Sequence, residues 1–179
     1  MSGIRDYTLL RRASELELNV CILANRACRR KAVQKIFAII SRLGNGVFWY
    51  ALTLLLPVLY GLDAIPVSLR MVGVGMVGLI LYKLIKLFTE RDRPYTASEK
   101  INLGTAPLDR YSFPSGHTLH AVGFTTVALW YYPELSIVLI PFTLLVAASR
   151  VILGLHYPTD VLAGALIGAL TAAAGIILL

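Results

Sequence analysis

Two residues that follow an apolar segment, His156 and Asp160, have side-chain types and a spacing that could do chemistry. Side chains four residues apart lie on one face of a helix. Pro158 interrupts the helical pattern between them, yet a carboxylate–imidazole contact remains feasible. Such a contact fixes the tautomer of the imidazole and stabilises its positive charge, as in hydrolase triads. The plainer alternative is a surface hydrogen bond at the start of a helix.

A second histidine closes the motif 114-PSGH-117, which opens another apolar segment. Proline is favoured in the first turn of a helix and serine is a preferred N-cap, so a helix is expected to begin here. Capping accounts for Ser115 but not for Gly116. A glycine lets a ligand approach the backbone closely, and the unpaired N–H groups at a helix N-terminus bind anions. His117 by itself would also suit an interfacial position. His120, one turn further along the same face, is expected to be structural.

Three cations stand at or inside the apolar segments. Lys86 closes one segment, and snorkelling towards the membrane surface is an equal alternative to ligand binding there. Arg93 precedes Pro94, which marks a break from helix, and this arginine alone could bind a lipid phosphate. Arg150 lies inside an otherwise apolar segment, where an arginine requires a partner, and a phosphate is one candidate.

The elements that must position these residues are membrane helices. The 179 residues are 57% hydrophobic, and the mean hydropathy is +0.71. A membrane-spanning helix takes about 20 apolar residues. The candidate spans are residues 47–62, 67–88, 117–132, 135–153 and 160–179.

The order and packing of these spans bear on the site. Gly164 and Gly168 form a GxxxG step in the last span, and small residues there permit close helix packing. With alternating spans, the helix ends that carry the cations, His117, His156 and Asp160 all fall on the same side of the bilayer. We therefore predict an all-α, polytopic membrane helix bundle with about five transmembrane helices and a single polar site.

The residue types gathered on that side also predict a reaction. Arginine and lysine neutralise phosphoryl oxygens. One neutral histidine can attack phosphorus, and the other can protonate the leaving alcohol. The three histidines are accompanied by no HExxH motif and no carboxylate cluster, so neither a metal nor another cofactor is expected. These groups together are typical of a phosphate-transfer site.

Three motifs, in order along the chain, resemble the three-part signature of the type-2 phosphatidic acid phosphatase superfamily: Lys86-x6-Arg93-Pro94, Pro114-Ser115-Gly116-His117 and Ser149-Arg150-x5-His156-x3-Asp160. The resemblance implies metal-independent hydrolysis of a phosphomonoester or diphosphate through a phosphohistidine intermediate. His156 is then the nucleophile, and Asp160 orients it and stabilises its charge. His117 is then the general acid, which later activates water. The resemblance also implies the residues that bind the phosphoryl group: Lys86, Arg93, Ser115, Gly116 and Arg150.

Residues 1–46 are expected to form amphipathic helices on the membrane surface, ahead of a transmembrane phosphatase core at residues 47–179. Apolar positions recur in the first region at three and four residues, with charged residues between them. A degenerate sixth span at about 16–43 is the alternative. The cations of residues 26–31 disfavour it, since each costs at least about 2.5 kcal/mol at the bilayer centre. No signal peptide is expected.

The charge of the chain predicts its surroundings. A net charge of +7 fits contact with anionic lipid headgroups or phosphorylated substrates, and no nucleic-acid motif accompanies it. We expect an integral protein of the bacterial inner membrane whose partners are membrane lipids and a phosphorylated lipid substrate, not nucleic acid. Of the 17 Lys and Arg residues, only Arg70 lies towards the side opposite the site, so the positive-inside rule favours a cytoplasmic site.

The predicted activity is a lipid phosphate phosphatase acting on phosphatidic acid, phosphatidylglycerophosphate or a similar lipid. One alternative within enzymes is a phosphatase for undecaprenyl diphosphate, lipid A or a lipid-linked sugar, which would use the same residues. The non-enzymatic alternative is a lipid-phosphate binding or transport protein. The sequence does not distinguish the substrates or indicate an oligomeric state.

Overall fold

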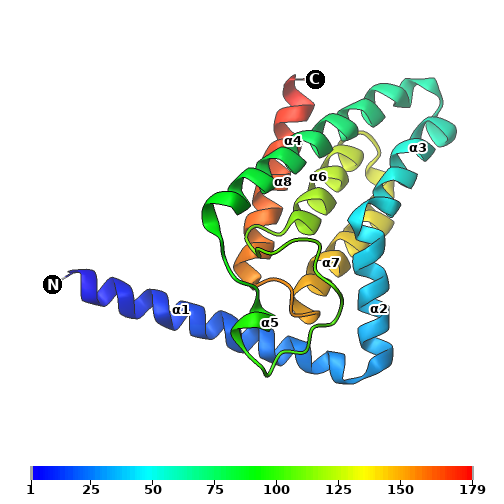
Figure 1. Cartoon of the computed structure of the whole chain (residues 1–179). Coiled ribbons are helices and arrows are strands. Elements are labelled where there is room, and N and C mark those ends of the chain that lie inside the picture. Colours follow the sequence, from blue (N-terminus) through cyan, green and yellow to red (C-terminus); the bar gives the residue numbers. More distant parts are fainter. Residues whose placement is uncertain (1, 179) are drawn as a thin grey trace.

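The computed structural model describes the backbone of residues 2–178 and the side chains of residue 12 and residues 14–178. The described residues form helices and connecting loops, with no strand among them. The α-helices are α1 (Ser2–Asn25), α2 (Lys31–Arg42), α3 (Phe48–Tyr60), α4 (Ile65–Thr89), the single turn α5 (Pro94–Ala97), α6 (Gly116–Tyr131), α7 (Ser136–Ile152) and α8 (Pro158–Leu178). The expected all-α bundle is confirmed (Figure 1).

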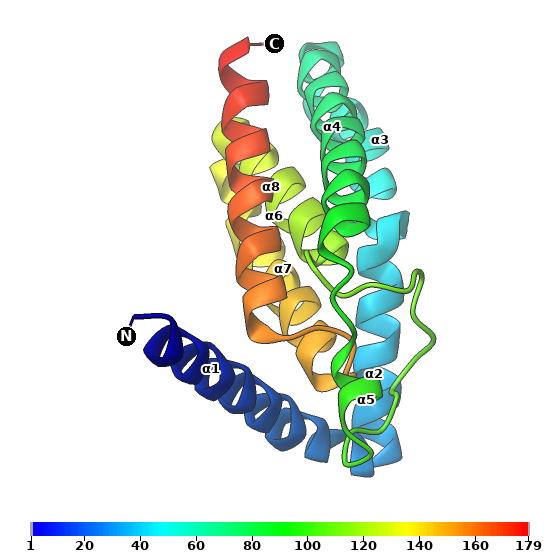
Figure 2. The same ribbon diagram turned by 60° about the vertical axis from the view of Figure 1, so that its left-hand side comes forward.

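Four segments of the described chain are long and apolar enough to cross a membrane: residues 31–60, 62–97, 133–152 and 158–178. The remaining predicted span, 117–132, corresponds to α6, which has only 16 residues. α6 packs against α4, α7 and α8, so most of its surface faces protein rather than lipid (Figures 1 and 2). A central helix of this kind does not need the length or the hydropathy of a lipid-facing one.

α2 and α3 form one bent segment. Between them, residues 43–47 make a wide helical turn in which Asn45 and Gly46 leave the helical dihedral angles, and the φ angle of Gly46 is 129°. Residues with a Cβ rarely adopt such a φ angle, which accounts for the glycine. The domain boundary expected after residue 46 stays a prediction, and residues 31–60, on both sides of it, form one segment long and apolar enough to cross a membrane. The membrane-surface location of the residues before it stays a prediction.

Two glycines allow α8 to pack closely against the start of α6. A Cβ on Gly164 would lie 2.5 Å from the carbonyl oxygen of Ser115. A Cβ on Gly168 would overlap the carbonyl oxygen of Leu119. The close packing predicted from the GxxxG step is thereby confirmed. The same contact brings the backbone N–H of Ser115 to the carbonyl oxygen of Asp160, at 3.0 Å, and so joins the two motifs.

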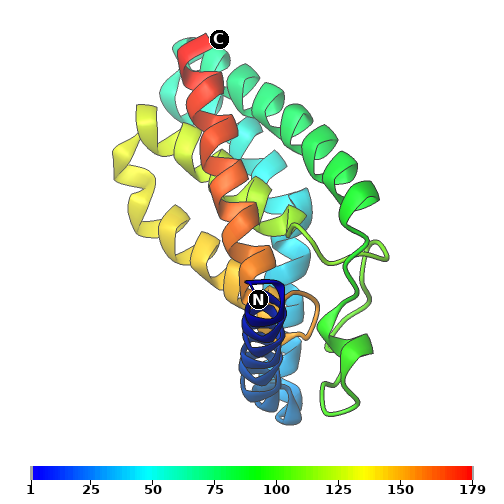
Figure 3. The same cartoon turned by 90° about the vertical axis from the view of Figure 1, so that its left-hand side faces the viewer.

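α1 lies across the end of the bundle at which α2 begins and α4 ends (Figures 2 and 3). Its inner face includes Cys21 and Asn25, which are buried. Its outer face exposes three apolar side chains: Leu16, Val20 and Leu23. An apolar stripe on a helix in this position is typical of helices that lie in the membrane interface.

Candidate active site

Most of the predicted site residues line one cavity, which lies at the end of the bundle where α4 and α7 finish and α6 begins. The cavity has a volume of about 570 Å³, and the predicted residues in its wall are Lys86, Arg93, Gly116, His117, Arg150 and His156. Ser115 and Asp160 are buried behind this wall. Residues from three separate motifs of the sequence therefore lie close together in space. Their chemical roles stay predictions.

His156 lies between a cation and a carboxylate. Its Nε2 atom is 3.3 Å from Nη1 of Arg93, and its Nδ1 atom is 3.6 Å from Oδ2 of Asp160. Nδ1 is buried and has no hydrogen-bond partner in the described structure. Burial and the neighbouring cations, Arg150 first among them, hold the pKa of His156 well below its usual range. The ring is therefore neutral near pH 7, with a lone pair available for chemistry.

Asp160 is buried in the first turn of α8, where both oxygens of its carboxylate are held. Oδ2 accepts a hydrogen bond from the backbone N–H of Tyr157 at 2.8 Å. Oδ1 accepts one from Nη1 of Arg91 at 2.6 Å. A carboxylate at a helix N-terminus also gains from the helix dipole. Asp160 is thus fixed beside His156 by its own helix and by an arginine that no motif marks.

Arg150 has a buried guanidinium, and no carboxylate among the described residues pairs with it. It is 2% exposed, and its Nη1 donates a hydrogen bond to Oγ of Ser41 in α2. Within the described chain its Nε has no partner at all. A buried charge that lacks a counter-ion is strongly destabilising. An anion bound in the cavity would supply a counter-ion for this guanidinium.

The start of α6 differs in one detail from the expectation. The hydroxyl of Ser115 is hydrogen-bonded to the hydroxyl of Thr118, at 3.0 Å, and makes no side-chain cap to the backbone. The predicted serine cap is therefore wrong. The first N–H groups of a helix have no intrahelical partner. Gly116 and His117 line the cavity, so the first turn of α6 forms part of its wall.

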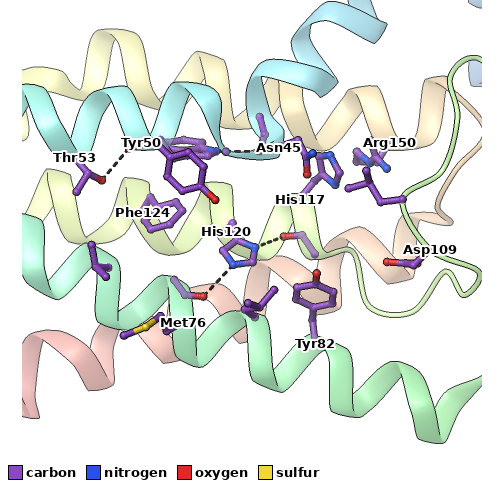
Figure 4. Close-up of a pocket in the computed structure, with 18 of the residues that line it drawn as sticks. Asn45, Tyr50, Thr53, Met76, Tyr82, Asp109, His117, His120, Phe124 and Arg150 are labelled. Atoms are coloured by element: carbon purple, nitrogen blue, oxygen red, sulfur yellow. Dashed lines mark hydrogen bonds between the residues drawn. The ribbon is translucent and has the colours of Figure 1, made fainter.

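His120 ties α6 to α4. Its two ring nitrogens lie 2.9 Å from the carbonyl oxygen of Gly116 and 3.1 Å from that of Gly75 (Figure 4). These contacts hold the first turn of α6 against the middle of α4. His120 also lines the cavity, so its structural role stays a prediction.

Asp109 is a site residue that sequence reasoning missed. Its Oδ1 accepts hydrogen bonds from Nζ of Lys86 at 2.6 Å and from Nη2 of Arg93 at 2.8 Å. Burial opposes ionisation of this carboxyl, but the hydrogen bonds and charges of the two cations prevail and lower its pKa. Asp109 belongs to an irregular loop with no periodic pattern, and only its closeness to the PSGH motif could have marked it.

The cavity has a second, apolar end. From the cations it continues between α3 and α4 along these side chains: Trp49, Leu54, Val72, Met76, Leu79 and Phe124. Figure 4 shows Thr53 and Met76 at one end of the cavity and Arg150 and Asp109 at the other. The cavity therefore joins a cationic end to an apolar channel inside the membrane-spanning part of the bundle.

The fold and the site together define a helical membrane protein with a pocket lined by three cations and three histidines. The sequence profile of the PAP2 superfamily matches residues 67–178, which include every predicted site residue. The chain belongs to the PAP2 superfamily, and the resemblance seen in its three motifs is confirmed.

Several curated proteins are similar in sequence. Undecaprenyl-diphosphatase BcrC of Bacillus subtilis is 35% identical over 114 residues, which are 63% of this chain and 58% of that protein. An undecaprenyl-diphosphatase of Sulfolobus acidocaldarius is 32% identical over 131 residues, 72% of this chain and 62% of that one. A lipid A 1-phosphatase of Rhizobium johnstonii is 31% identical over 94 residues, 50% of this chain and 38% of that one. The chain thus spans less than two thirds of the length of each.

Two crystal structures share the fold over most of the chain. LpxE of Aquifex aeolicus has a TM-score of 0.76 and 29% identity, over 90% of this chain and 95% of that one. A PAP2-type phosphatidylglycerolphosphate phosphatase of Bacillus subtilis has a TM-score of 0.69 and 25% identity, over 92% of this chain and 84% of that one. The bundle described above is therefore the transmembrane PAP2 fold.

Proposed function

We propose that this protein is a membrane phosphatase that hydrolyses a lipid phosphomonoester or diphosphate through a phosphohistidine intermediate. The observation that carries the proposal is one cavity lined by three histidines, with three cations beside His117 and His156 at one end and an apolar channel at the other. A lipid-phosphate binding or transport protein would need the cations alone. The buried pair of His156 and Asp160 adds groups that binding does not use, which favours an enzyme.

In the first step, the lone pair on Nε2 of His156 attacks phosphorus, and the bond between phosphorus and the leaving oxygen breaks. His117, whose protonated form the negative charge of the bound phosphate favours, donates its proton to that oxygen. The phosphorylated ring of His156 carries a positive charge, which the carboxylate of Asp160 stabilises from the Nδ1 side. In the second step, His117 takes a proton from water, whose oxygen attacks phosphorus, and the bond between phosphorus and Nε2 of His156 breaks. Inorganic phosphate is released, and His156 returns to its neutral form.

The phosphoryl oxygens carry negative charge in the transition state, and preorganised cations lower its energy. Arg150 is assigned the central contact, because it lines the cavity and its Nε has no hydrogen-bond partner among the described residues. Lys86 and Arg93 complete the cationic wall, and the N–H group of Gly116 adds a donor from the start of α6. Ser115 acts by fixing that helix start, since its hydroxyl is bonded to Thr118.

The apolar channel supports a substrate whose reacting phosphate is attached to a hydrocarbon chain. A chain in this channel would hold the phosphate at the cationic end while the rest of the lipid stays in the membrane. Phosphatidic acid and phosphatidylglycerophosphate meet this requirement. Undecaprenyl diphosphate is the second candidate, because two of the similar curated proteins are named undecaprenyl-diphosphatases.

We place the protein in the bacterial inner membrane with its site on the cytoplasmic side, which the distribution of lysine and arginine supports. α8 ends on the opposite side of the bundle from the site (Figure 1). A C-terminal alkaline phosphatase fusion should therefore be active and a C-terminal green fluorescent protein fusion dark. The reverse pattern would overturn this orientation.

The activity is tested by phosphate release from purified protein in detergent that contains EDTA. The substrates are phosphatidic acid, phosphatidylglycerophosphate and undecaprenyl diphosphate. EDTA is included because the described residues contain no group of three or more His, Cys, Asp or Glu that could hold a metal ion. We expect turnover of at least one lipid, and none with His156→Ala. Release that requires a divalent metal, or that survives His156→Ala in folded protein, would refute the mechanism.

A further inference from the structure

Arg91 is the centre of a second network, which lies outside the cavity. Its Nη1 donates hydrogen bonds to Oδ1 of Asp160 at 2.6 Å and to Oγ1 of Thr159 at 2.8 Å. Its Cζ is 4.1 Å from the ring centroid of Tyr157, a distance at which cation–π attraction is strong. Arg91 therefore binds both the first turn of α8 and the carboxylate of Asp160, which faces His156.

Glu17 of α1 completes this network from the other side. Its Oε2 accepts a hydrogen bond from Nη2 of Arg91 at 2.7 Å, and its Oε1 accepts one from the backbone N–H of Thr159 at 2.9 Å. Pro158, the first residue of α8, has no N–H, so Thr159 presents the first free donor of the helix. A carboxylate from another helix thus caps α8 at the end where the helix dipole favours negative charge.

We propose that Glu17 and Arg91 are positioning residues of the phosphatase reaction, which fix Asp160 so that its carboxylate supports His156 during phosphorylation. This inference rests on the proposed function. Neither Glu17 nor Arg91 lines the cavity, so neither touches the substrate. Glu17 lies outside residues 67–178, the part matched by the superfamily profile. A helix beyond that core therefore contributes to the site.

The geometry at Asp160 explains why its position matters. Its Oδ2 is 3.6 Å from Nδ1 of His156, which is too long for a hydrogen bond. A small movement of the carboxylate decides whether the bond closes when the ring becomes positive. Arg91 holds one oxygen and thereby limits that movement. Without Arg91 the buried carboxylate loses its cation, and it would rotate away or take a proton.

Glu17 fixes the direction of the Arg91 side chain. A guanidinium presents its donors in a planar fork, so a partner on Nη2 determines where Nη1 points. α1 can hold Glu17 in place because Asn25, two turns further on, is itself anchored. The Asn25 amide donates hydrogen bonds to the carbonyl oxygens of Asn102 and Ile152, both at 2.9 Å. α1 is therefore attached to the end of α7, beside the loop that carries His156.

The test compares Glu17→Gln, Arg91→Gln and Arg91→Lys with wild-type protein in detergent micelles. Glu99→Gln, which removes an exposed carboxylate from a loop, is the matched control. The substrate is whichever of phosphatidic acid, phosphatidylglycerophosphate and undecaprenyl diphosphate the wild type hydrolyses fastest. For each variant we would measure kcat, KM, the Ki of inorganic phosphate and the melting temperature.

We expect kcat to fall about 100-fold in Arg91→Gln and about tenfold in Glu17→Gln, since a misplaced catalytic group costs on this scale. The Ki of inorganic phosphate should change by less than about twofold, because the cationic wall of the cavity is untouched. Arg91→Lys keeps the charge and should recover part of kcat. The double variant Glu17→Gln/Arg91→Gln should be no slower than Arg91→Gln, because both residues act through one carboxylate.

The inference is overturned if Glu17→Gln and Arg91→Lys both have the kcat of the control. It is equally overturned if kcat, phosphate affinity and melting temperature fall together, since α1 would then be a structural support only. If Arg91→Gln does not fold, Glu17→Gln and Arg91→Lys carry the test. If the wild-type protein hydrolyses none of the lipids, the proposed function itself is refuted. If the wild type is active, His156→Ala is inactive and Glu17→Gln has the kcat of the wild type, only this inference is refuted.

Discussion

Asp109 and Arg93 are bonded twice at the cationic end of the cavity. Nη2 of Arg93 donates a hydrogen bond to the carboxylate of Asp109 at 2.8 Å, and Nε of Arg93 donates one to its backbone carbonyl at 3.2 Å. The same carboxylate oxygen also accepts a hydrogen bond from Lys86. A phosphate that enters the cavity therefore meets two cations already paired with an anion, whereas Arg150 is bonded to the hydroxyl of Ser41 and to no carboxylate of the described residues.

Replacing Asp109 by asparagine should tighten the binding of phosphate. The carboxylate competes with phosphate for Lys86 and Arg93, and its removal frees both for the ligand. We expect the Ki of inorganic phosphate to fall about fivefold, which corresponds to about 1 kcal/mol. The measurement is inhibition of lipid hydrolysis by inorganic phosphate at constant ionic strength.

Glu99→Gln is the control for this experiment, since it removes the same charge from an exposed part of the same loop. Its Ki for phosphate should equal that of the wild type. Weaker phosphate binding by Asp109→Asn would contradict the prediction. It would mean that Asp109 holds Lys86 and Arg93 in place instead of competing for them.

The pH dependence of the reaction should reflect the neutral ring of His156. Burial and then the charge of Arg150 lower the pKa of this histidine. The attacking form is the neutral one, so activity is retained below the usual histidine pKa of about 6.5 and is lost as pH falls through the lowered value. Arg150→Gln should slow turnover and also move the acid limb of kcat/KM to higher pH.

Comparison of the two pH profiles on one lipid separates this effect from ionisation of the substrate, which is common to both. Profiles with the same acid limb in wild type and Arg150→Gln would show that His156 does not determine the limb. A wild-type limb at or above about pH 6.5 would be inconsistent with a neutral, buried nucleophile.

Gly164→Ala should destabilise the protein and lower its activity. In an exposed helix this change stabilises by about 1 kcal/mol. Here the new Cβ would lie 2.5 Å from the carbonyl oxygen of Ser115, so α6 and α8 must separate. Overpacking of this kind costs about 1–3 kcal/mol. Thermal unfolding in detergent would measure the loss, with Ala173→Val on the exposed face of α8 as the control. An unchanged melting temperature would show that the two helices can adjust.

The helix bundle and the residues that line one end of its cavity could be predicted from the sequence, because membrane helices follow simple physical rules. Long apolar segments form membrane helices, and their alternation determines which ends share a side of the bilayer. Lys86, Arg150 and His156 could therefore be brought together without any knowledge of the packing. The bend at residues 43–47 was not predicted, because it depends on backbone angles that Gly46 permits but does not require.

The residues that support the site were harder to predict than those that line it. Glu17 and Arg91 are 74 residues apart, and their ion pair exists only because α1 crosses the start of α8. Asp109 sits in a loop without periodicity, so nothing in its neighbourhood indicates the direction of its side chain. Contacts of this kind depend on how elements dock, and single-sequence patterns do not contain that information.

The location of α1 in the membrane interface can be tested with labels on its outer face. Cys21 and Cys28 are buried, and burial raises the pKa of both thiols, that of Cys21 to about 12. Neither native cysteine should react with a thiol reagent, because the thiolate is the reactive form. Leu23→Cys lies in the exposed apolar stripe, and Arg26→Cys lies at an exposed position in the charged turn that follows α1.

With a fluorophore on each introduced cysteine and the protein in nanodiscs, spin-labelled lipids should quench the Leu23 position strongly and the Arg26 position weakly. The apolar stripe would then lie against the acyl chains and Arg26 would point towards water, as charged residues of other interfacial helices do. Equal quenching at both positions would contradict this orientation. Weak quenching at both would place α1 in water, where three exposed apolar side chains would require a protein partner instead of lipid.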